Sequence, residues 1–421
     1  MSDRYLMISA DSHGGLRVRD YRDYLEAEYR EDFDEWVSIF YEKVYNPNWK
    51  MVQAMMANGG EDQERMETLR DQVELGIGDA SGRIDALEDD GWVATVVYTG
   101  VDFDTLPPFT SISFGGEHLH SSREQLWAGC RAFNRWMADY CSQYPGRLAG
   151  VVQIPDLDDV DEAVAEIEQA VAAGLFGGIQ LPSLKRDQPP YGDPSFDRVW
   201  AACHELKMPV NCHAGTPKPD PRLFGDGPLA DLLSATEQDF WMVRRPLGNF
   251  IFGGVFDRFP DVKLVFTEKN AYWIPAMVEE LELAYGRAQR LRSDKRIELR
   301  PREYWMRNCG VGASFMTPKE AEMRQDIGVA TIMYGSDFPH LEGTYPFTRE
   351  SLRRSFAPVP RDELDAMLGG NAARIYRFDL DALRPIADRV GPRVDEVATP
   401  ITELPRGFRD IDIEEMSGAN A

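Results

Sequence analysis

The chain alternates short apolar runs with amphipathic helical segments, and this alternation constrains its fold more than any other feature. Eight runs have the length and composition of buried strands. Helical spacing of apolar residues recurs between several of them, for example at 123–144, 157–174 and 193–207. Buried strands alternating with helices indicate an α/β fold with a parallel sheet, and eight units favour a closed (β/α)8 TIM-like barrel. The runs are residues 5–10, 92–98, 148–154, 178–181, 208–212, 262–267, 309–314 and 331–335.

Two segments fall outside this repeating unit. About eighty residues separate the first two runs, which predicts a long helical insertion after strand 1, at about 14–82. It contains an amphipathic helix at 21–44 and a Met-rich stretch at 49–56, and we interpret it as a lid or an oligomer contact. Residues 381–421 contain four spaced prolines and few apolar runs, so we expect an extended C-terminal tail after a metal-dependent barrel formed by 1–380.

Composition narrows the class of protein. Hydrophobic residues make up 43% of the 421 residues, enough for a large core. The formal net charge of −25 argues against nucleic acid and anionic membranes as partners, because both require a basic surface. The five cysteines form no C-x-x-C pair, and no apolar run approaches the ~18 residues of a membrane span. We therefore expect a cytoplasmic protein.

Residues with metal-ligand or acid–base chemistry gather where predicted strands end. In a barrel, active sites form at the carboxyl ends of the strands. The first run ends in "ADSH", whose aspartate and histidine point to one face of an extended chain. Three of the six histidines in the chain lie at such ends. The candidates are Asp11 and His13 after the first run, His213 after the fifth, Glu268 and Lys269 after the sixth, and Asp337 and His340 after the eighth.

These side chains predict a metal site on the barrel axis. His13, His213, Asp337 and either Asp11 or Glu268 could converge there. Two imidazoles with carboxylates suit Zn, Mn or Fe as a divalent ion, without any thiolate. Taken singly, each residue has a structural explanation, such as a turn cap or a surface ion pair. Taken together at four strand ends, they favour the metal site.

The motifs also carry a resemblance to a known family. "ISADSHGG", "GGIQLP", "VNCHAGTP", "LVFTEKNAYWIP", "MYGSDFPHLEG" and "LGGNAARIYRFD" occur in this order across about residues 5–380. With them the chain resembles the amidohydrolase superfamily, in the amidohydrolase-related group that includes the aminocarboxymuconate-semialdehyde decarboxylase-like enzymes. The resemblance implies a metal-dependent hydrolase or non-oxidative decarboxylase acting on a small carboxylated compound, with aromatic and unsaturated acids as candidates.

The resemblance also implies roles for individual residues. The metal ligands would be Asp11 and His13, in place of the family's H-x-H pair, with His213 and Asp337. Glu268 stands where the family often has a further histidine, so it is either a ligand or an acid–base group. The candidates for proton transfer are Asp337, Glu268 and His340. Strand four ends without the lysine of dinuclear relatives, which favours one ion and leaves two open.

Several alternatives remain at this stage. The candidate substrate-binding residues are His120, Arg245 and Lys269, although the two cations could instead pair with some of the 71 acidic residues. A carboxylate-rich site could also hold two ions, as in a dinuclear iron/manganese oxygenase (hydroxylase) that is one subunit of a heteromeric enzyme. We expect a small-molecule substrate and a homo-oligomer, with a hetero-oligomer as the alternative.

Overall fold

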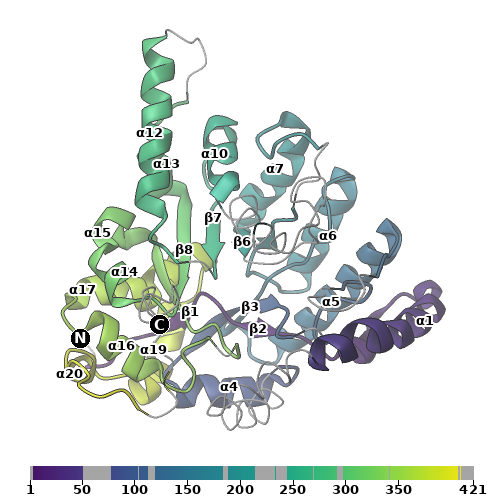
Figure 1. The fold of residues 1–421 in the computed structure, drawn as a ribbon, viewed down its shortest axis with the longest axis horizontal. Helices are drawn as coiled ribbons and strands as arrows, with labels where there is room; N and C mark the ends of the chain where they lie inside the picture. Colours follow the sequence, from purple (N-terminus) through teal and green to yellow (C-terminus); the bar gives the residue numbers. More distant parts are fainter. Residues whose placement is uncertain are drawn as a thin grey trace.

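The strands form two parallel sheets (Figure 1). The computed structural model describes residues 3–50, 77–102, 104–111, 119–183, 188–213, 233, 244–268, 270–291, 297–340, 342–405 and 408. One sheet has the order β1-β3-β2 with β4 paired to β3, and the other has the order β5-β6-β7-β8-β9. Each of the eight predicted runs contains a strand. The strands are β1 (Ile8–Ser9), β2 (His13–Gly14), β3 (Ala94–Thr99), β4 (Leu148–Gly150), β5 (Ile179–Gln180), β6 (Val210–His213), β7 (Leu264–Thr267), β8 (Cys309–Ser314) and β9 (Ile332–Gly335).

Backbone hydrogen bonds join the two sheets at both of their edges. Val152, just after β4, forms a parallel bridge with Ile179 of β5. At the other edge, the Ala10 amide donates to the Tyr334 carbonyl at 3.0 Å. The Asp337 amide likewise donates to the Asp11 carbonyl at 3.0 Å. The segments that follow β1 and β9 therefore run side by side.

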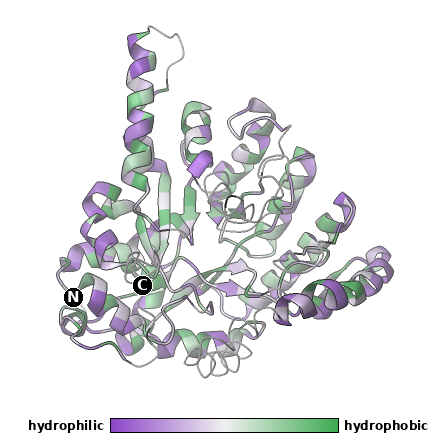
Figure 2. Ribbon diagram, in the orientation of Figure 1, coloured by the Kyte–Doolittle hydropathy of each residue, from purple (hydrophilic) through white to green (hydrophobic). Residues whose placement is uncertain are grey.

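Helices pack around the strands, and the strands are more uniformly hydrophobic than the helices (Figure 2). Helix α5 begins with a capping box in which Ser122 and Gln125 satisfy each other's backbone amides. Within the described residues, the α-helices between β2 and β9 are α4 (Ala80–Asp89), α5 (Arg123–Ser142), α6 (Val160–Ala172), α7 (Asp197–Leu206), α10 (Arg245–Phe252), α11 (Val255–Arg258), α12 (Ile274–Arg290), α13 (Pro301–Asn308), α14 (Pro318–Glu322) and α15 (Arg324–Ile327), besides α1 in the insertion. After β9 come α16 (Thr348–Phe356), α17 (Arg361–Asp365) and α18 (Asn371–Tyr376). None of the described helices combines the length and the apolarity that crossing a membrane requires.

The predicted helix at 21–44 is broken into shorter pieces. Residues Val18–Tyr24 and Ala27–Tyr29 are 3-10 helical, α1 spans Arg30–Phe40, and a π-helical turn follows it. Leu25 and Glu26 have extended backbone between the first two pieces, and the Leu25 side chain is 2% exposed. The Met-rich stretch lies almost wholly outside the described residues.

The expectation of an extended C-terminal tail is wrong for its first part. Helix α19 spans Leu380–Val390, and α20 (Val394–Val397) follows it. Pro385 lies inside α19, where proline normally costs stability. Leu383 and Ala387, four residues apart on one face, are 3% and 0% exposed and pack on the apolar core. Burial of this stripe outweighs the proline, which the proline spacing alone did not reveal.

Candidate metal centre

The backbone is unusual at three strand ends, two of which carry candidate site residues. Glu268 follows β7 directly, and Asp337 lies two residues after β9. Their φ angles are 57° and 54°, in the left-handed region that residues other than glycine rarely adopt. Phe315, directly after β8, has a φ of 42°. Such strained conformations gather at functional sites, where the surrounding fold enforces them.

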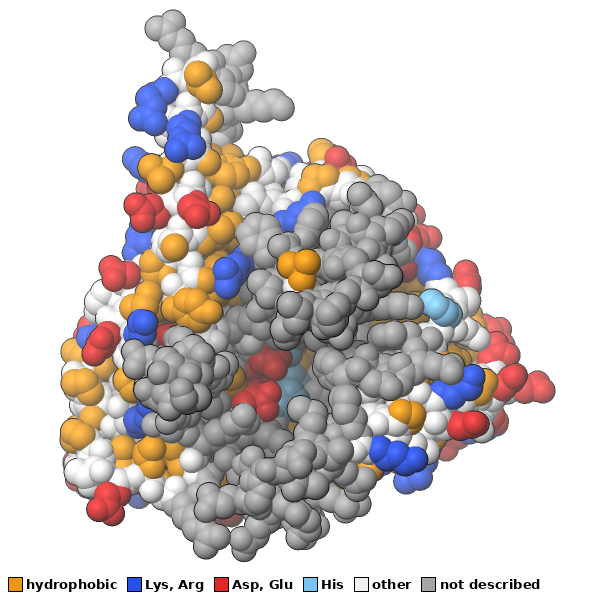
Figure 3. All heavy atoms as spheres, in the orientation of Figure 1, with side chains coloured by type: hydrophobic (Ala, Val, Ile, Leu, Met, Phe, Trp, Pro, Cys, Tyr) orange, Lys and Arg blue, Asp and Glu red, His pale blue; other side chains and the backbone are white. Residues whose placement is uncertain are grey.

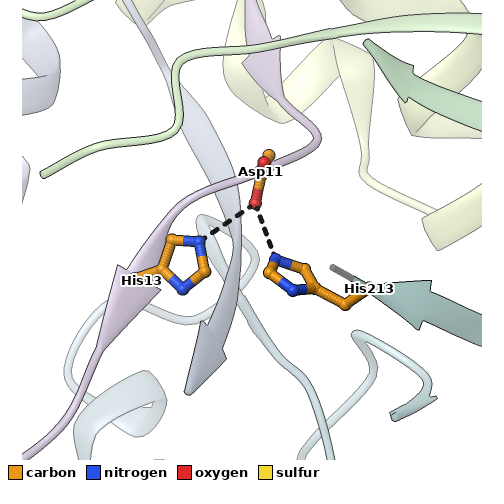
Figure 4. Close-up of side chains that lie close together, drawn as sticks. All are labelled: Asp11, His13 and His213. Carbon is orange, nitrogen blue, oxygen red and sulfur yellow. Dashed lines mark ion pairs between the residues drawn. The ribbon is translucent and has the colours of Figure 1, made fainter. Parts of the chain in front are cut away.

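Asp11 lies between the two histidines (Figure 4). Its Oδ1 atom is 3.5 Å from His13 Nε2 and 3.5 Å from His213 Nε2. One ligand atom from each of these residues lies within 4.8 Å of the others. His13 Nε2 is also 3.2 Å from Asp337 Oδ1. All four side chains are buried, so the predicted strand-end residues do converge.

A second group of acidic and imidazole side chains adjoins the first. His213 Nδ1 is 3.2 Å from Glu268 Oε2, and His340 Nδ1 is 2.8 Å from Asp337 Oδ1. Glu268, Asp337, His340 and Glu342 each offer an atom within 4.8 Å of the others. Acidic and histidine side chains are visible near the centre of the face in Figure 3. Glu342 was not predicted, although it lies in the same motif as Asp337, five residues further on.

Hydrogen bonds fix the ring orientation of two histidines. His13 Nδ1 lies 2.9 Å from the Thr99 carbonyl, to which it can only donate. The other ring nitrogen, Nε2, therefore carries a lone pair toward Asp11 and Asp337 when the ring is neutral. His340 Nε2 lies 3.2 Å from the Gly100 carbonyl. Both rings thus contact the carboxyl end of β3, at its last residue and the residue that follows it, and β3 pairs with β1 and β2.

Two further polar groups support the first strand end, and neither was predicted. The Ser314 hydroxyl, at the end of β8, donates to Asp11 Oδ2. The guanidinium of Arg83, on α4, donates to the His13 carbonyl and, at 3.2 Å, to the Ser12 hydroxyl. Arg83 is fully buried, and among the described residues it has no acidic partner. Arg83 therefore binds the backbone of the segment that carries Asp11 and His13.

Charge within the site separates the pKa values of its groups. Burial opposes ionisation of Asp11, but His13 and His213 outweigh it and hold its pKa far below the usual value. Burial, with the charges of Asp337 and Asp11, raises the pKa of Glu268 to about 8 against the opposing effect of His213. Burial would lower the pKa of His340, but Asp337 and Glu268 raise it to about 10. The site thus combines an ionised carboxylate with groups that retain protons.

The donor atoms fit a divalent cation. Asp11 Oδ1, His13 Nε2 and Asp337 Oδ2 are buried and make no hydrogen bond within the part of the chain that the structure describes. Leaving such atoms unpaired is costly unless a ligand satisfies them. Nitrogen and carboxylate donors suit Zn, Mn or Fe. The predicted ligand set therefore has the chemistry and the placement of a metal site.

The predicted substrate-binding residues have less structural support. His120 is exposed in the segment before α5, and Arg245 begins α10. Lys269 lies outside the described residues. The role of these three side chains in binding a substrate stays a prediction.

Comparison with known proteins finds one matching family and several similar solved structures. The sequence profile of the family described as Amidohydrolase matches residues 109–378. The fold is similar to that of the 5-carboxyvanillate decarboxylase LigW from Sphingomonas paucimobilis, with 20% identity, a TM-score of 0.59, and coverage of 89% of this chain and 99% of that one.

Two other solved structures share the fold. One is a 5-carboxyvanillate decarboxylase from Novosphingobium aromaticivorans complexed with manganese and 4-hydroxy-3-methoxy-5-nitrobenzoic acid, with 17% identity, a TM-score of 0.61, and coverage of 89% of this chain and 97% of that one. The other is a 2,6-dihydroxybenzoate decarboxylase from Rhizobium, with 17% identity, a TM-score of 0.53, and coverage of 70% and 87%. At these identities the likeness establishes the fold alone.

Proposed function

This chain belongs to the amidohydrolase family, and from that premise we propose that it is a metal-dependent, non-oxidative decarboxylase of a small aromatic carboxylic acid. One observation carries the proposal: the buried convergence of Asp11, His13, His213 and Asp337 beside Glu268 and His340. The similar solved structures include decarboxylases of aromatic acids, one of them complexed with manganese. Hydrolysis of a small carboxylated compound is the other activity that this centre could support.

The proposal includes a closed barrel around the site. Hydrogen bonds at both edges of the two sheets support closure into a (β/α)8 barrel. Residues 1–380 would form this barrel, and 381–421 would follow it. The insertion at about 14–82 would be a lid or an oligomer contact, and its described helix α1 packs against α5. The carboxyl ends of β1, β6, β7 and β9 carry the residues of the candidate metal centre.

Four residues would hold a single divalent ion: Asp11, His13, His213 and Asp337. When bound, the ion supplies a positive charge that binds and polarises the substrate's oxygen atoms. Asp11 contributes negative charge without competing protons, because its neighbours keep it ionised. The Thr99 carbonyl keeps His13 in the orientation that presents Nε2 to the centre. Thus the chain holds its donor atoms in place before any ligand arrives.

The chemistry then requires one proton at the substrate carbon. The bond to the carboxylate carbon breaks, carbon dioxide leaves, and the electron pair stays on the ring carbon, where it forms a bond to the delivered proton. Glu268 is placed to deliver this proton, since it lies beside His213 and its side chain is 19% exposed. His340 Nδ1 lies 3.9 Å from Glu268 Oε1, too far for a direct hydrogen bond, so a proton would return from His340 to Glu268 through one water.

The test is an anaerobic assay of the manganese-loaded enzyme with a panel of hydroxylated benzoic acids. We expect about one divalent ion per chain by elemental analysis, and release of carbon dioxide in the absence of oxygen. Two iron ions per chain with turnover only in oxygen would instead establish the dinuclear oxygenase. Release of a hydrolysis product without carbon dioxide, from carboxylated esters or amides, would assign a hydrolase.

A further inference from the structure

Helix α12 projects from the body of the molecule (Figure 1). Its first half is anchored by Ile274, Val278 and Leu281, which are 0%, 2% and 7% exposed. Part of the remaining surface of the helix faces solvent, although Tyr285, Ala288 and Gln289 are partly buried. Leu283 is 52% exposed, and Leu291, just past the end of the helix, is 82% exposed. Single exposed leucines are common on protein surfaces, so the charges around Leu283 decide whether this face can bind a partner.

The charges on α12 are separated along its axis. Exposed acidic residues Glu279 and Glu280 lie in the half nearer the body, whereas Arg287 and Arg290 lie in the outer half. Figure 3 shows Lys and Arg side chains on the outer part of this projection, with acidic ones nearer the body. Within the described residues, no ion pair involves Glu279 or Arg287. Their charges are thus available to another molecule.

The spacing of these residues makes the surface complementary to itself. Glu279, Leu283 and Arg287 follow one another at intervals of four, so they form one stripe along the helix. Leu283 lies midway between the two charges. If two such helices pack antiparallel about a two-fold axis through Leu283, the leucines meet each other. Each Glu279 then faces Arg287 of the second copy, twice per contact.

We propose that α12 forms an antiparallel contact between two copies of this chain, centred on Leu283. The partner is a second copy of this chain, because a single stripe carries both the acidic and the basic residue that the pairing requires. A single pair of helices of this length buries less than the roughly 1,600 Å² of a typical stable interface. The contact is therefore concentration-dependent and weakened by salt. It is independent of the metal chemistry proposed above.

Charge reversal tests the pairing by sedimentation velocity on the full chain. Glu279→Arg and Arg287→Glu should each weaken self-association by roughly ten-fold or more, because each places like charges opposite one another twice. An equimolar mixture of the two variants should recover association, since both facing pairs are then of opposite charge. Lys319→Glu, which makes the same charge change as Arg287→Glu on the exposed surface of α14, should associate as the unmodified chain does.

Three results would overturn the proposal: an unmodified chain that stays monomeric at about 100 μM, single variants that associate normally, or a mixture that fails to recover. A second measurement depends on position rather than charge. Leu283→Cys should cross-link to a dimer with a short bismaleimide, because the five native cysteines are buried. Ala276→Cys on the same face should not, since its two copies would lie about 21 Å apart along the axis. Equal cross-linking of both variants would also contradict the two-fold contact.

Discussion

Asp11 and Asp90 are both buried aspartates, yet their pKa values shift in opposite directions. Asp11 is 0% exposed and Asp90 is 4% exposed. Asp11 has two histidines beside it, which hold its pKa far below the usual value despite burial. Asp90 has only neutral donors from Thr348 and Trp92, and burial raises its pKa to about 7. Hydrogen bonds from neutral groups therefore do not keep a buried carboxylate ionised, whereas nearby imidazoles do.

The two carboxylates also differ in what remains for them to bind. Asp11 Oδ1 makes no hydrogen bond within the described part of the chain. Both oxygens of Asp90 accept hydrogen bonds, from the Thr348 amide at 3.2 Å and the Trp92 indole at 3.3 Å. Asp11 follows β1, and Asp90 precedes β3. The contrast distinguishes a carboxylate at the carboxyl end of a strand, where we propose a metal site, from a structural carboxylate before the amino end of another strand.

We expect the largest effect from a substitution that removes one of the two histidines beside Asp11. His213→Ala should abolish bound metal and lower turnover by roughly 10³-fold or more, since it deletes a ligand and one of the groups that keep Asp11 ionised. Elemental analysis and the decarboxylation assay measure both. The matched control is His204→Ala on α7, whose ring instead lies 4.0 Å from Asp261. Full metal content in His213→Ala would show that the ligand assignment is wrong.

Glu268→Gln sharpens the contrast between ligands and proton carriers. The amide keeps the size of the side chain but cannot deliver the proton, so turnover should fall by roughly 10²–10⁴-fold. Metal content should stay near that of the unmodified chain. If the variant loses its metal instead, Glu268 is a ligand, and His340 becomes the candidate for proton delivery.

Arg83→Met tests how the binding strand end is supported. Methionine preserves much of the volume but removes the buried guanidinium that donates to the His13 carbonyl, whereas the Ser12 hydroxyl still accepts from Thr95 at 2.7 Å. We expect the free energy of unfolding to fall by about 2–3 kcal/mol, measured by urea titration. The control is Arg389→Met, whose exposed guanidinium pairs with Glu88, and its effect should be much smaller. Equal losses from both variants would contradict a supporting role for Arg83.

The last prediction concerns Asp90. Because its pKa is raised in the folded state, that state retains a proton that the unfolded chain has released, and stability falls as pH rises from about 4 to about 7. Asp90→Asn cannot ionise, so between pH 4 and pH 8 it should gain stability relative to the unmodified chain, by up to about 4 kcal/mol. Urea unfolding at the two pH values measures the difference. A constant difference at both pH values would exclude ionisation of Asp90 as its cause.

The strands and most of the site were predictable because both depend on local pattern. A buried strand is a short apolar run, and a barrel site lies where such runs end, so His13, His213 and Asp337 could be placed together without coordinates. Arg83 could not, because nothing local marks a helical arginine as buried behind a strand seventy residues earlier. Helix α19 was missed because a proline argued against a helix whose stability comes from distant packing partners.

The left-handed backbone at Glu268, Phe315 and Asp337 limits how this protein can change. At Asp337, glycine or asparagine would suit the backbone well, but both remove the carboxylate that the proposed centre would use. At position 337 the backbone conformation therefore favours replacement of the aspartate, whereas the proposed chemistry of the centre opposes it. Phe315 bears the same conformational cost without a ligand role, so a glycine there could relieve roughly 1 kcal/mol of strain. A variant library can therefore include substitutions at position 315. Substitutions at positions 268 and 337 would change both the backbone conformation of the loop and the proposed catalytic side chain.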